Sequence, residues 1–258
     1  MKVKLPTQRS MQMRWAAAFL PCFSASAELR PLSTDRPDTT ESPYTVDAGH
    51  FQVEMEIANW TRDGSRREFS LGELNAKMGL STAIDLQWVL PFYTQVRKGG
   101  EGFGEMEIRL KYNFWGNDSG ATALAIMPFI KLPTARGDLG NGDYEGGIIV
   151  PYGFEGPAGW SCGVMGEVDF NSDEDGRGNH LTGIFSATTS HAVTETTGIF
   201  LELVVSQSAE SDAAFQGYFN TGTTWAVTPT WQLDGGLRVG LTPAATDVTP
   251  FLGASAKF

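Results

Sequence analysis

The stretch from Glu105 to Trp115 reads EMEIRLKYNFW and alternates strictly between polar and apolar residues up to Phe114. Its apolar positions are Met106, Ile108, Leu110, Tyr112 and Phe114, set against Glu105, Glu107, Arg109, Lys111 and Asn113. Successive side chains of a β-strand point to opposite faces, so this pattern predicts a strand with one apolar face and one polar face.

The same period of two recurs from residue 50 to the end of the chain. It predicts strands at 50–61, 67–80, 84–96, 104–115, 121–133, 144–155, 160–170, 180–191, 197–207, 214–226, 230–241 and 249–258. Soluble sheets favour strands of about five or six residues, whereas a tilted strand needs about 9–11 residues to cross a bilayer. The pattern therefore predicts an all-β chain that forms a transmembrane antiparallel β-barrel of about 12 strands.

The connections between these strands differ in length in a regular way. Those after odd-numbered strands are long, polar and glycine-rich, as at 134–143 and 171–179, while those after even-numbered strands are short, as at 81–83 and 156–159. Outer-membrane barrels combine long extracellular loops with tight periplasmic turns. This sorting predicts a location in the cell outer membrane, with the N- and C-termini in the periplasm.

Residues 1–27 have the three parts of a secretory signal peptide. They are a basic start, an apolar core from Trp15 to Phe23, and the cleavage motif Ala25-Ser26-Ala27. Removal of this segment takes away four of the 19 basic residues and none of the 30 acidic residues, which leaves a net charge of −15. It also removes Cys22, so Cys162 has no internal disulfide partner. A chain this acidic is not expected to bind nucleic acid.

Residues 28–49 precede the barrel of residues 50–258 and form a separate N-terminal segment. Its prolines Pro37 and Pro43 favour an extended course. Two interpretations remain open. The segment is a solvated periplasmic leader, or it is a plug in the periplasmic mouth with Arg36 paired to lumenal carboxylates such as Glu54 or Glu56. The plug candidates are Asp35, Arg36, Asp38 and Glu41.

The polar faces of the predicted strands give a set of charged residues that line the lumen. It consists of Glu54, Glu56, Glu73, Lys77, Asp85, Glu105, Glu107, Arg109, Lys111, Glu167, Asp169, Glu202, Asp234, Arg238 and Lys257. Acids outnumber bases in this set, which favours cations over anions in any channel. About eight strands enclose only side chains and sixteen or more leave an open pore, so a narrow pore and a filled barrel both remain open for twelve.

We assign no catalytic residue, metal or cofactor from the sequence. The chain has three histidines, His50, His180 and His191. His180 and His191 stand at opposite ends of one predicted strand, about 36 Å apart at roughly 3.3 Å per residue, and cannot share a metal. The loop 171–176 matches part of a calcium-binding loop, but Thr182 occupies the position of the bidentate glutamate, so a solvated acidic loop is favoured over a surface cation site.

Four stretches carry a family resemblance: Ser33–Trp60, Gly102–Trp115, Met127–Phe154 and the ending QLDGGLRVGLTPAATDVTPFLGASAKF. They resemble the MetA-pathway of phenol degradation family of outer-membrane transporters. The resemblance implies a channel or transporter for passive passage of small solutes, hydrophobic or aromatic molecules among them. The alternatives are a phospholipase-like or protease-like barrel enzyme, and a filled barrel with a structural or surface-binding role.

The chain ends on Phe258, whose face of the last predicted strand also carries Leu252, Ala254 and Ala256. A terminal aromatic residue on an alternating strand resembles the membrane-insertion signal that the barrel assembly machinery recognises. The partners expected are therefore this machinery, outer-membrane lipids, lipopolysaccharide and a small solute whose identity the sequence does not give.

Overall fold

The computed structural model describes residues 29–135, 139–173 and 178–258. The predicted signal peptide, 1–27, lies outside the described residues, and so do Glu174, Asp175 and Gly176 of the calcium-like loop. Among the described residues, no helix is both long enough and apolar enough to span a membrane.

The described chain forms long strands joined by turns and loops. These are β1 (Phe51–Asp63), β2 (Arg66–Gly79), β3 (Ile84–Val96), β5 (Met106–Trp115), β6 (Thr122–Leu132), β7 (Glu145–Glu155), β8 (Trp160–Ser172), β9 (Asn179–Ala192), β10 (Thr197–Ser208), β11 (Gln216–Thr228), β12 (Trp231–Gly240) and β13 (Val248–Lys257). A two-residue strand, β4 (Glu101–Gly102), pairs with β3, and a 3-10 turn, η2 (Pro157–Gly159), precedes β8. The twelve long strands correspond one to one with the predicted ones.

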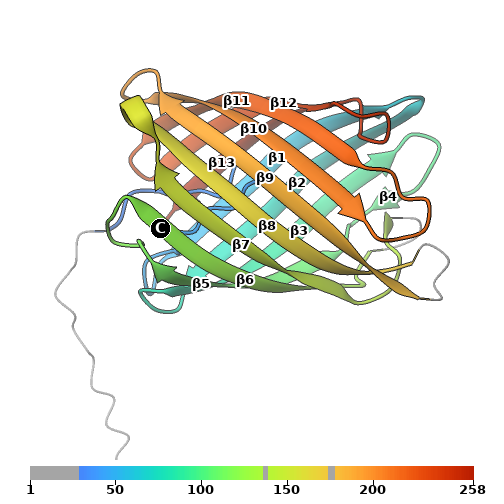
Figure 1. Cartoon of the computed structure of the whole chain (residues 1–258), viewed down its shortest axis with the longest axis horizontal. Coiled ribbons are helices and arrows are strands. Elements are labelled where there is room, and N and C mark those ends of the chain that lie inside the picture. The colour runs from blue at the N-terminus through green and yellow to red at the C-terminus, as the bar shows by residue number, and fades with distance from the viewer. Residues whose placement is uncertain (1–28, 136–138, 174–177) are drawn as a thin grey trace, which may run out of the picture.

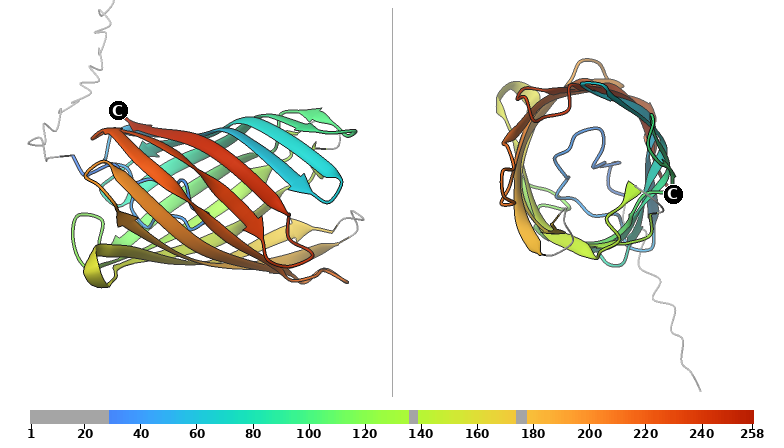
Figure 2. Two further views of the ribbon diagram at one scale, coloured as in Figure 1. Left: turned by 90° about the horizontal axis from the view of Figure 1, so that it is seen from above. Right: turned by 90° about the vertical axis from the view of Figure 1, so that its right-hand side faces the viewer.

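All of the strand pairings are antiparallel, and the sheet closes on itself. Each long strand pairs with its neighbours in the chain, and β1 pairs with both β2 and β13. The result is the tilted cylinder of Figure 1, seen end-on as a ring in Figure 2. The prediction of a 12-stranded antiparallel barrel is confirmed. Closure pairs the backbone groups of every wall strand, which a lipid environment requires.

The barrel has a polar inside and an apolar outside. Lys111 and Asp85 are 0% exposed on the inner face, whereas Leu203 is 55% and Leu252 is 62% exposed on the outer face. A water-soluble protein shows the reverse distribution. Strands of a transmembrane barrel show this reversed distribution, because their outer face contacts lipid tails and their inner face is polar.

Both described termini lie at the same end of the barrel (Figures 1 and 2). Here the backbone N–H of Phe258 donates to the carbonyl of Phe51 at 2.8 Å, so the last residue closes the ladder between β13 and β1. The short connections 80–83, 116–121, 156–159 and 193–196 also lie at this end, and most of the longer connections lie at the opposite end. The two-residue turn 64–65 between β1 and β2 also lies at the opposite end, so the predicted sorting of connections by length is wrong there. We refer to these as the terminal end and the loop end.

A charge placed on the outer face should destabilise the barrel in lipid. Leu203 lies in the middle of β10, and Leu203→Arg should lower the free energy of unfolding by about 2–4 kcal/mol, the cost of Arg or Lys at the bilayer midplane. The measurement is urea unfolding in phospholipid vesicles, followed by the gel migration of unboiled samples. Leu241→Arg is the control, because Leu241 is similarly exposed but lies in the β12–β13 connection. An equal loss of stability in both variants would contradict the lipid-facing assignment of β10.

Candidate functional site in the barrel lumen

The N-terminal segment, residues 29–50, runs inside the barrel rather than beside it (Figure 2, end-on view). Its backbone makes hydrogen bonds with side chains of the wall instead of adding a strand. The N–H of Val46 donates to Asp85 of β3 at 3.0 Å, and Asn113 of β5 donates to the carbonyl of Pro43 at 2.8 Å. The segment therefore fills part of the lumen at the terminal end.

Asp35 forms the most buried of the charged contacts. Its carboxylate accepts hydrogen bonds from Lys111 at 2.7 Å and from Lys77, and its backbone N–H donates to Glu54 at 3.0 Å. Lys77 also contacts Glu54. Burial alone raises the pKa of Asp35, but the adjacent Lys111 and Lys77 ammonium groups outweigh it and hold that pKa well below its usual range.

Arg36 makes the opposite kind of contact, a cation between wall carboxylates. Its guanidinium lies 2.7 Å from Asp234 of β12 and 3.2 Å from Glu56 of β1. Glu56 is shared with Arg238 at 2.7 Å. A Cβ atom at Gly253 would lie 2.2 Å from the Arg36 guanidinium, so the absence of a side chain on β13 leaves the space that Arg36 occupies.

Thr39 and Thr40 bring the segment to Glu202 of β10. Glu202 accepts the backbone N–H groups of Thr39 at 2.9 Å and Thr40 at 2.6 Å, together with the side chain of Asn220 at 2.7 Å. The hydroxyl of Thr40 also lies 2.7 Å from that of Ser186. These three donors to the Glu202 carboxylate fix the position of the segment along the barrel axis.

Asp38 and Glu41 are carboxyl groups in acidic surroundings. Burial, with the nearby Glu202, raises the pKa of Asp38 from 3.8 to about 7. Burial and the charge of Asp35 raise the pKa of Glu41 to about 8, although Glu41 contacts Arg109 at 2.7 Å. These two groups therefore change protonation near neutral pH, unlike an ordinary exposed carboxyl group.

A further set of contacts anchors the start of the segment to the end of the chain. Arg30 lies 2.7 Å from Asp47, which lies 3.1 Å from Lys257 of β13. Thr45 is bonded to Asn117 of the β5–β6 connection, with its backbone N–H donating at 2.9 Å. The segment is thus held at both of its ends and in its middle.

The predicted lumen residues fall into groups around the segment. Glu54, Lys77 and Lys111 surround Asp35; Glu56, Asp234 and Arg238 surround Arg36; Glu107 and Arg109 lie beside Glu41; and Asp85 holds Val46. Glu105 is separate, 3.0 Å from Lys131 towards the loop end. Glu167 and Asp169 stand on the inner face of β8, and Asp169 Oδ1 is buried with no hydrogen-bond partner among the described residues.

Sequence reasoning missed the uncharged residues of this site. Gln52, Gln87, Asn113, Ser186 and Asn220 are all buried on the inner face, and all five hydrogen-bond either the segment or its carboxylate partners. They occupy polar positions of the same alternation that marked the charged residues. A search for all polar residues on that face, rather than charged ones alone, finds them.

The histidines are not assembled into a catalytic group within the described residues. His191 stacks on Trp160 with ring centroids 4.9 Å apart, and its Nδ1 lies 3.2 Å from the Gly159 carbonyl. His50 Nδ1 lies 3.2 Å from the Ala48 carbonyl. The sequence placed His180 and His191 at opposite ends of one strand, and β9 holds them there.

Two cavities lie beside the segment along the same three strands. One of about 450 Å³ is lined by Phe200 of β10, Ala226 of β11 and Gln232 of β12, towards the terminal end. The other, of about 230 Å³, is lined by Val204, Tyr218 and Arg238 of the same strands, towards the loop end. The contacts of Glu202 and Asp234 with the segment lie at the level between them.

Comparison with solved structures places this architecture among the barrels of the bacterial outer membrane. An outer membrane channel from Pseudomonas putida F1 superimposes with a TM-score of 0.69 at 16% identity, covering 84% of this chain and 98% of that channel. The NanC porin gives a TM-score of 0.59 at 8% identity, covering 81% of this chain and all of the porin. The fold is therefore that of an outer-membrane β-barrel. A search of the curated proteins finds no match.

The family is shown by sequence. The profile described as "Putative MetA-pathway of phenol degradation" matches residues 34–258, which includes most of the N-terminal segment and the whole barrel. The chain belongs to this family.

Removal of the Asp35 charge should release the segment. Asp35→Asn leaves Lys77 and Lys111 without their shared carboxylate, and loss of one partner from a buried ion pair costs about 3–5 kcal/mol. We expect faster chymotryptic cleavage after Tyr44 in the folded barrel. Asp63→Asn, an exposed aspartate at the far end of β1, is the control and should leave the cleavage rate unchanged. Equal cleavage of the wild type and Asp35→Asn would contradict the anchoring role of Asp35.

Docking of the segment should weaken as pH rises. The pKa of Asp38 is raised to about 7 in the folded state, so its contribution is fully present below its ordinary pKa of 3.8 and is lost as pH rises through about 7. Chymotryptic cleavage after Tyr44, corrected for the pH dependence of chymotrypsin on an unfolded peptide, should accelerate between pH 6 and pH 8, a range of roughly one unit on either side of that value. Asp38→Asn should reduce this acceleration. A pH profile identical in both proteins would show that Asp38 is not responsible.

Proposed function

We propose that this protein is a passive outer-membrane channel for small solutes, with a lumen narrowed by its own N-terminal segment. The observation that carries the proposal is the pair of cavities along β10, β11 and β12, separated where the segment contacts Glu202 and Asp234. A solute that follows these strands meets a single polar constriction. The two cavities would join if the segment moved away from Glu202 and Asp234.

The proposed solute is small, because the two cavities are of about 450 and 230 Å³. The family's description supports hydrophobic or aromatic molecules as candidates. The acidic surplus of the inner face favours cations over anions among charged solutes. We further propose that the protein is not an enzyme, which the contacts of His50 and His191 with backbone carbonyls support.

The proposed partners follow from the barrel surface. The exposed leucines of the outer face would contact lipid tails, and lipopolysaccharide would cover the loop end, with both termini in the periplasm. Phe258 is 64% exposed on the terminal end, where the barrel assembly machinery would read it.

A reversible cross-link tests the gating role of the segment directly. The hydroxyls of Thr40 and Ser186 lie 2.7 Å apart, so Thr40→Cys and Ser186→Cys together, in a Cys162→Ser background, should form a disulfide between segment and wall. We expect the lowest conductance in planar bilayers when this disulfide is oxidised, and a rise on reduction. The Cys162→Ser protein with only Thr40→Cys is the matched control and should not respond to reductant.

A deletion of residues 28–43 gives the complementary result. It removes Asp35, Arg36 and Thr40 together and should increase single-channel conductance by joining the two cavities. Unboiled gel migration checks that the barrel still forms. Unchanged conductance in the deletion, together with no effect of the disulfide, would contradict the proposal and leave a filled barrel with a structural role.

A further inference from the structure

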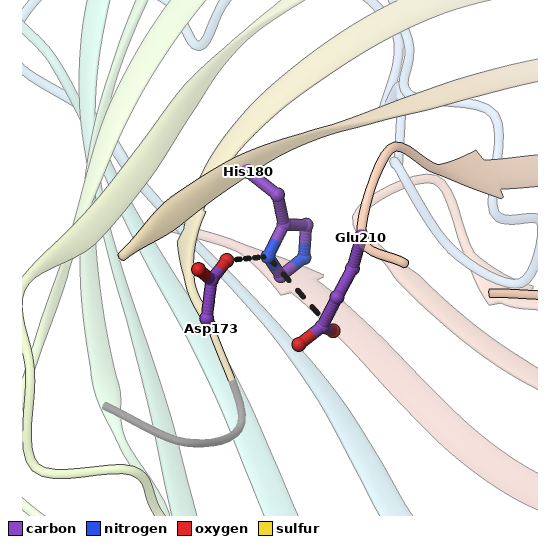
Figure 3. A group of neighbouring side chains, drawn as sticks. All are labelled: Asp173, His180 and Glu210. Carbon is purple, nitrogen blue, oxygen red and sulfur yellow. Dashed lines mark hydrogen bonds and ion pairs between the residues drawn. The ribbon is translucent and has the colours of Figure 1, made fainter. Parts of the chain in front are cut away.

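Three side chains that the sequence analysis did not connect meet at the loop end of the barrel (Figure 3). Asp173 follows β8, His180 is the second residue of β9, and Glu210 lies in the β10–β11 connection. His180 Nδ1 lies 2.9 Å from Asp173 Oδ1 and 3.9 Å from Glu210 Oε2. One ligand atom from each residue lies within 4.8 Å of the other two.

The strand register fixes this meeting. β9 and β10 pair Thr182 with Ser208, and the same register continued by two residues places Glu210 opposite His180. The N–H of Ala209 donates to the carbonyl of Leu181 at 2.7 Å, which continues the ladder to the neighbouring residue. The three side chains are therefore positioned by the backbone of the barrel wall and its immediate extension.

Gly178 keeps space open for the Asp173 carboxylate. The N–H of Asp173 donates to the carbonyl of Gly178 at 3.0 Å, so the two residues face each other beyond the last β8–β9 pair. A Cβ atom on Gly178 would lie 2.2 Å from Asp173 Oδ2. Any other residue here would displace the carboxylate from His180.

The chemistry of this set suits a divalent transition-metal ion. One imidazole nitrogen and two carboxylate oxygens are ligands that Zn²⁺ accepts, whereas Ca²⁺ and Mg²⁺ prefer oxygen alone. Tetrahedral bonds of about 2.0–2.1 Å would place ligand atoms roughly 3.3–3.4 Å apart. The observed separations of 2.9 and 3.9 Å bracket that value, so small side-chain movements would suffice.

The side chains are also accessible to an ion from solution. Asp173 and Glu210 are 29% and 28% exposed, and His180 is 12% exposed. Water can complete the coordination, and the ion can enter without opening the barrel. This ligand set differs from the calcium-like string of the sequence, because it draws a histidine and a glutamate from outside that string.

We propose that Asp173, His180 and Glu210 form a binding site for a divalent transition-metal ion of the Zn²⁺ type. The ion joins the β8–β9 connection to the β10–β11 connection at the loop end. Binding at His180 Nδ1 requires the imidazole tautomer that carries its proton on Nε2, so the ion takes the place of the hydrogen bond from Nδ1 to Asp173. The contacts of His180 with Asp173 and Glu210 are thereby replaced by three metal–ligand bonds.

The test is a calorimetric titration of the untagged, full-length folded protein with ZnCl₂ after treatment with a chelator. We expect one ion per chain. His180→Gln should weaken binding by at least the roughly 10–100-fold that loss of an outer-sphere partner costs at a metal site. His191→Gln is the matched control, since His191 lies on the same strand at the other end, and it should bind Zn²⁺ as the wild type does.

A second variant separates loss of the site from loss of folding. Gly178→Ala keeps all three ligands but displaces the Asp173 carboxylate, and it should also weaken Zn²⁺ binding while unboiled gel migration stays that of the folded barrel. Equal binding by wild type, His180→Gln and Gly178→Ala would overturn the proposal. Displacement of Zn²⁺ by an equal concentration of Ca²⁺ would overturn the assignment to transition metals.

Discussion

The carboxylate of Asp35 lies between the ammonium groups of Lys77 and Lys111, deep inside a cylinder of strands. Lys111 is 0% exposed, and an unpaired ammonium group at such a position would be expensive to keep charged. Neither lysine can turn outward, because the opposite face of each strand meets lipid. The alternation of polar and apolar residues therefore buries two ammonium groups in the lumen, and Asp35 supplies the anion that pairs with them.

The position of Arg36 has the same explanation with the charges reversed, because here the buried wall residues are carboxylates that need a cation. Glu56 and Asp234 face the lumen from β1 and β12, on strands separated only by β13. Arg238 compensates Glu56, and Arg36 supplies the remaining cation. Two adjacent residues of the segment thus have opposite charges, and each pairs with wall residues of the opposite sign. Shifting the segment by one residue would place either Asp35 among the acids or Arg36 among the lysines, depending on the direction, so the charges define its register.

The sequence predicts the wall far better than the site. Alternation is a local property, visible between residues two apart, so the strands and their inner faces follow directly from it. The contact of Arg36 with Glu56 was among the pairings anticipated, because both lie near the start of the barrel. The contact with Asp234 was not anticipated, since it joins residues 198 positions apart and depends on closure through β13.

The three residues at the loop end show the same limit. The spacing of the histidines excludes a metal shared between two of them, but it carries no information about carboxylates on other connections. Glu210 faces His180 only because the β9–β10 register continues past Ser208. The space for Asp173 depends on Gly178, whose role appears only when its cross-strand neighbour is known. The alternation of polar and apolar residues gives the residue types on each face but not the register between neighbouring strands, and this site depends on that register.

A lumen filled by ion pairs differs physically from one filled by apolar side chains. Apolar packing must create a void when it separates, whereas separated charges in a wide barrel can take up water. A buried ion pair returns little net stability beyond the cost of desolvating its partners. Docking of the segment through Asp35, Arg36 and the Glu202 contacts is therefore specific without having to be strong. The carboxyl groups of Asp38 and Glu41, whose pKa values are raised towards neutrality, weaken docking further as they ionise. The ion pairs that hold the segment in the lumen can thus also separate and hydrate, which would allow the segment to move and the lumen to open.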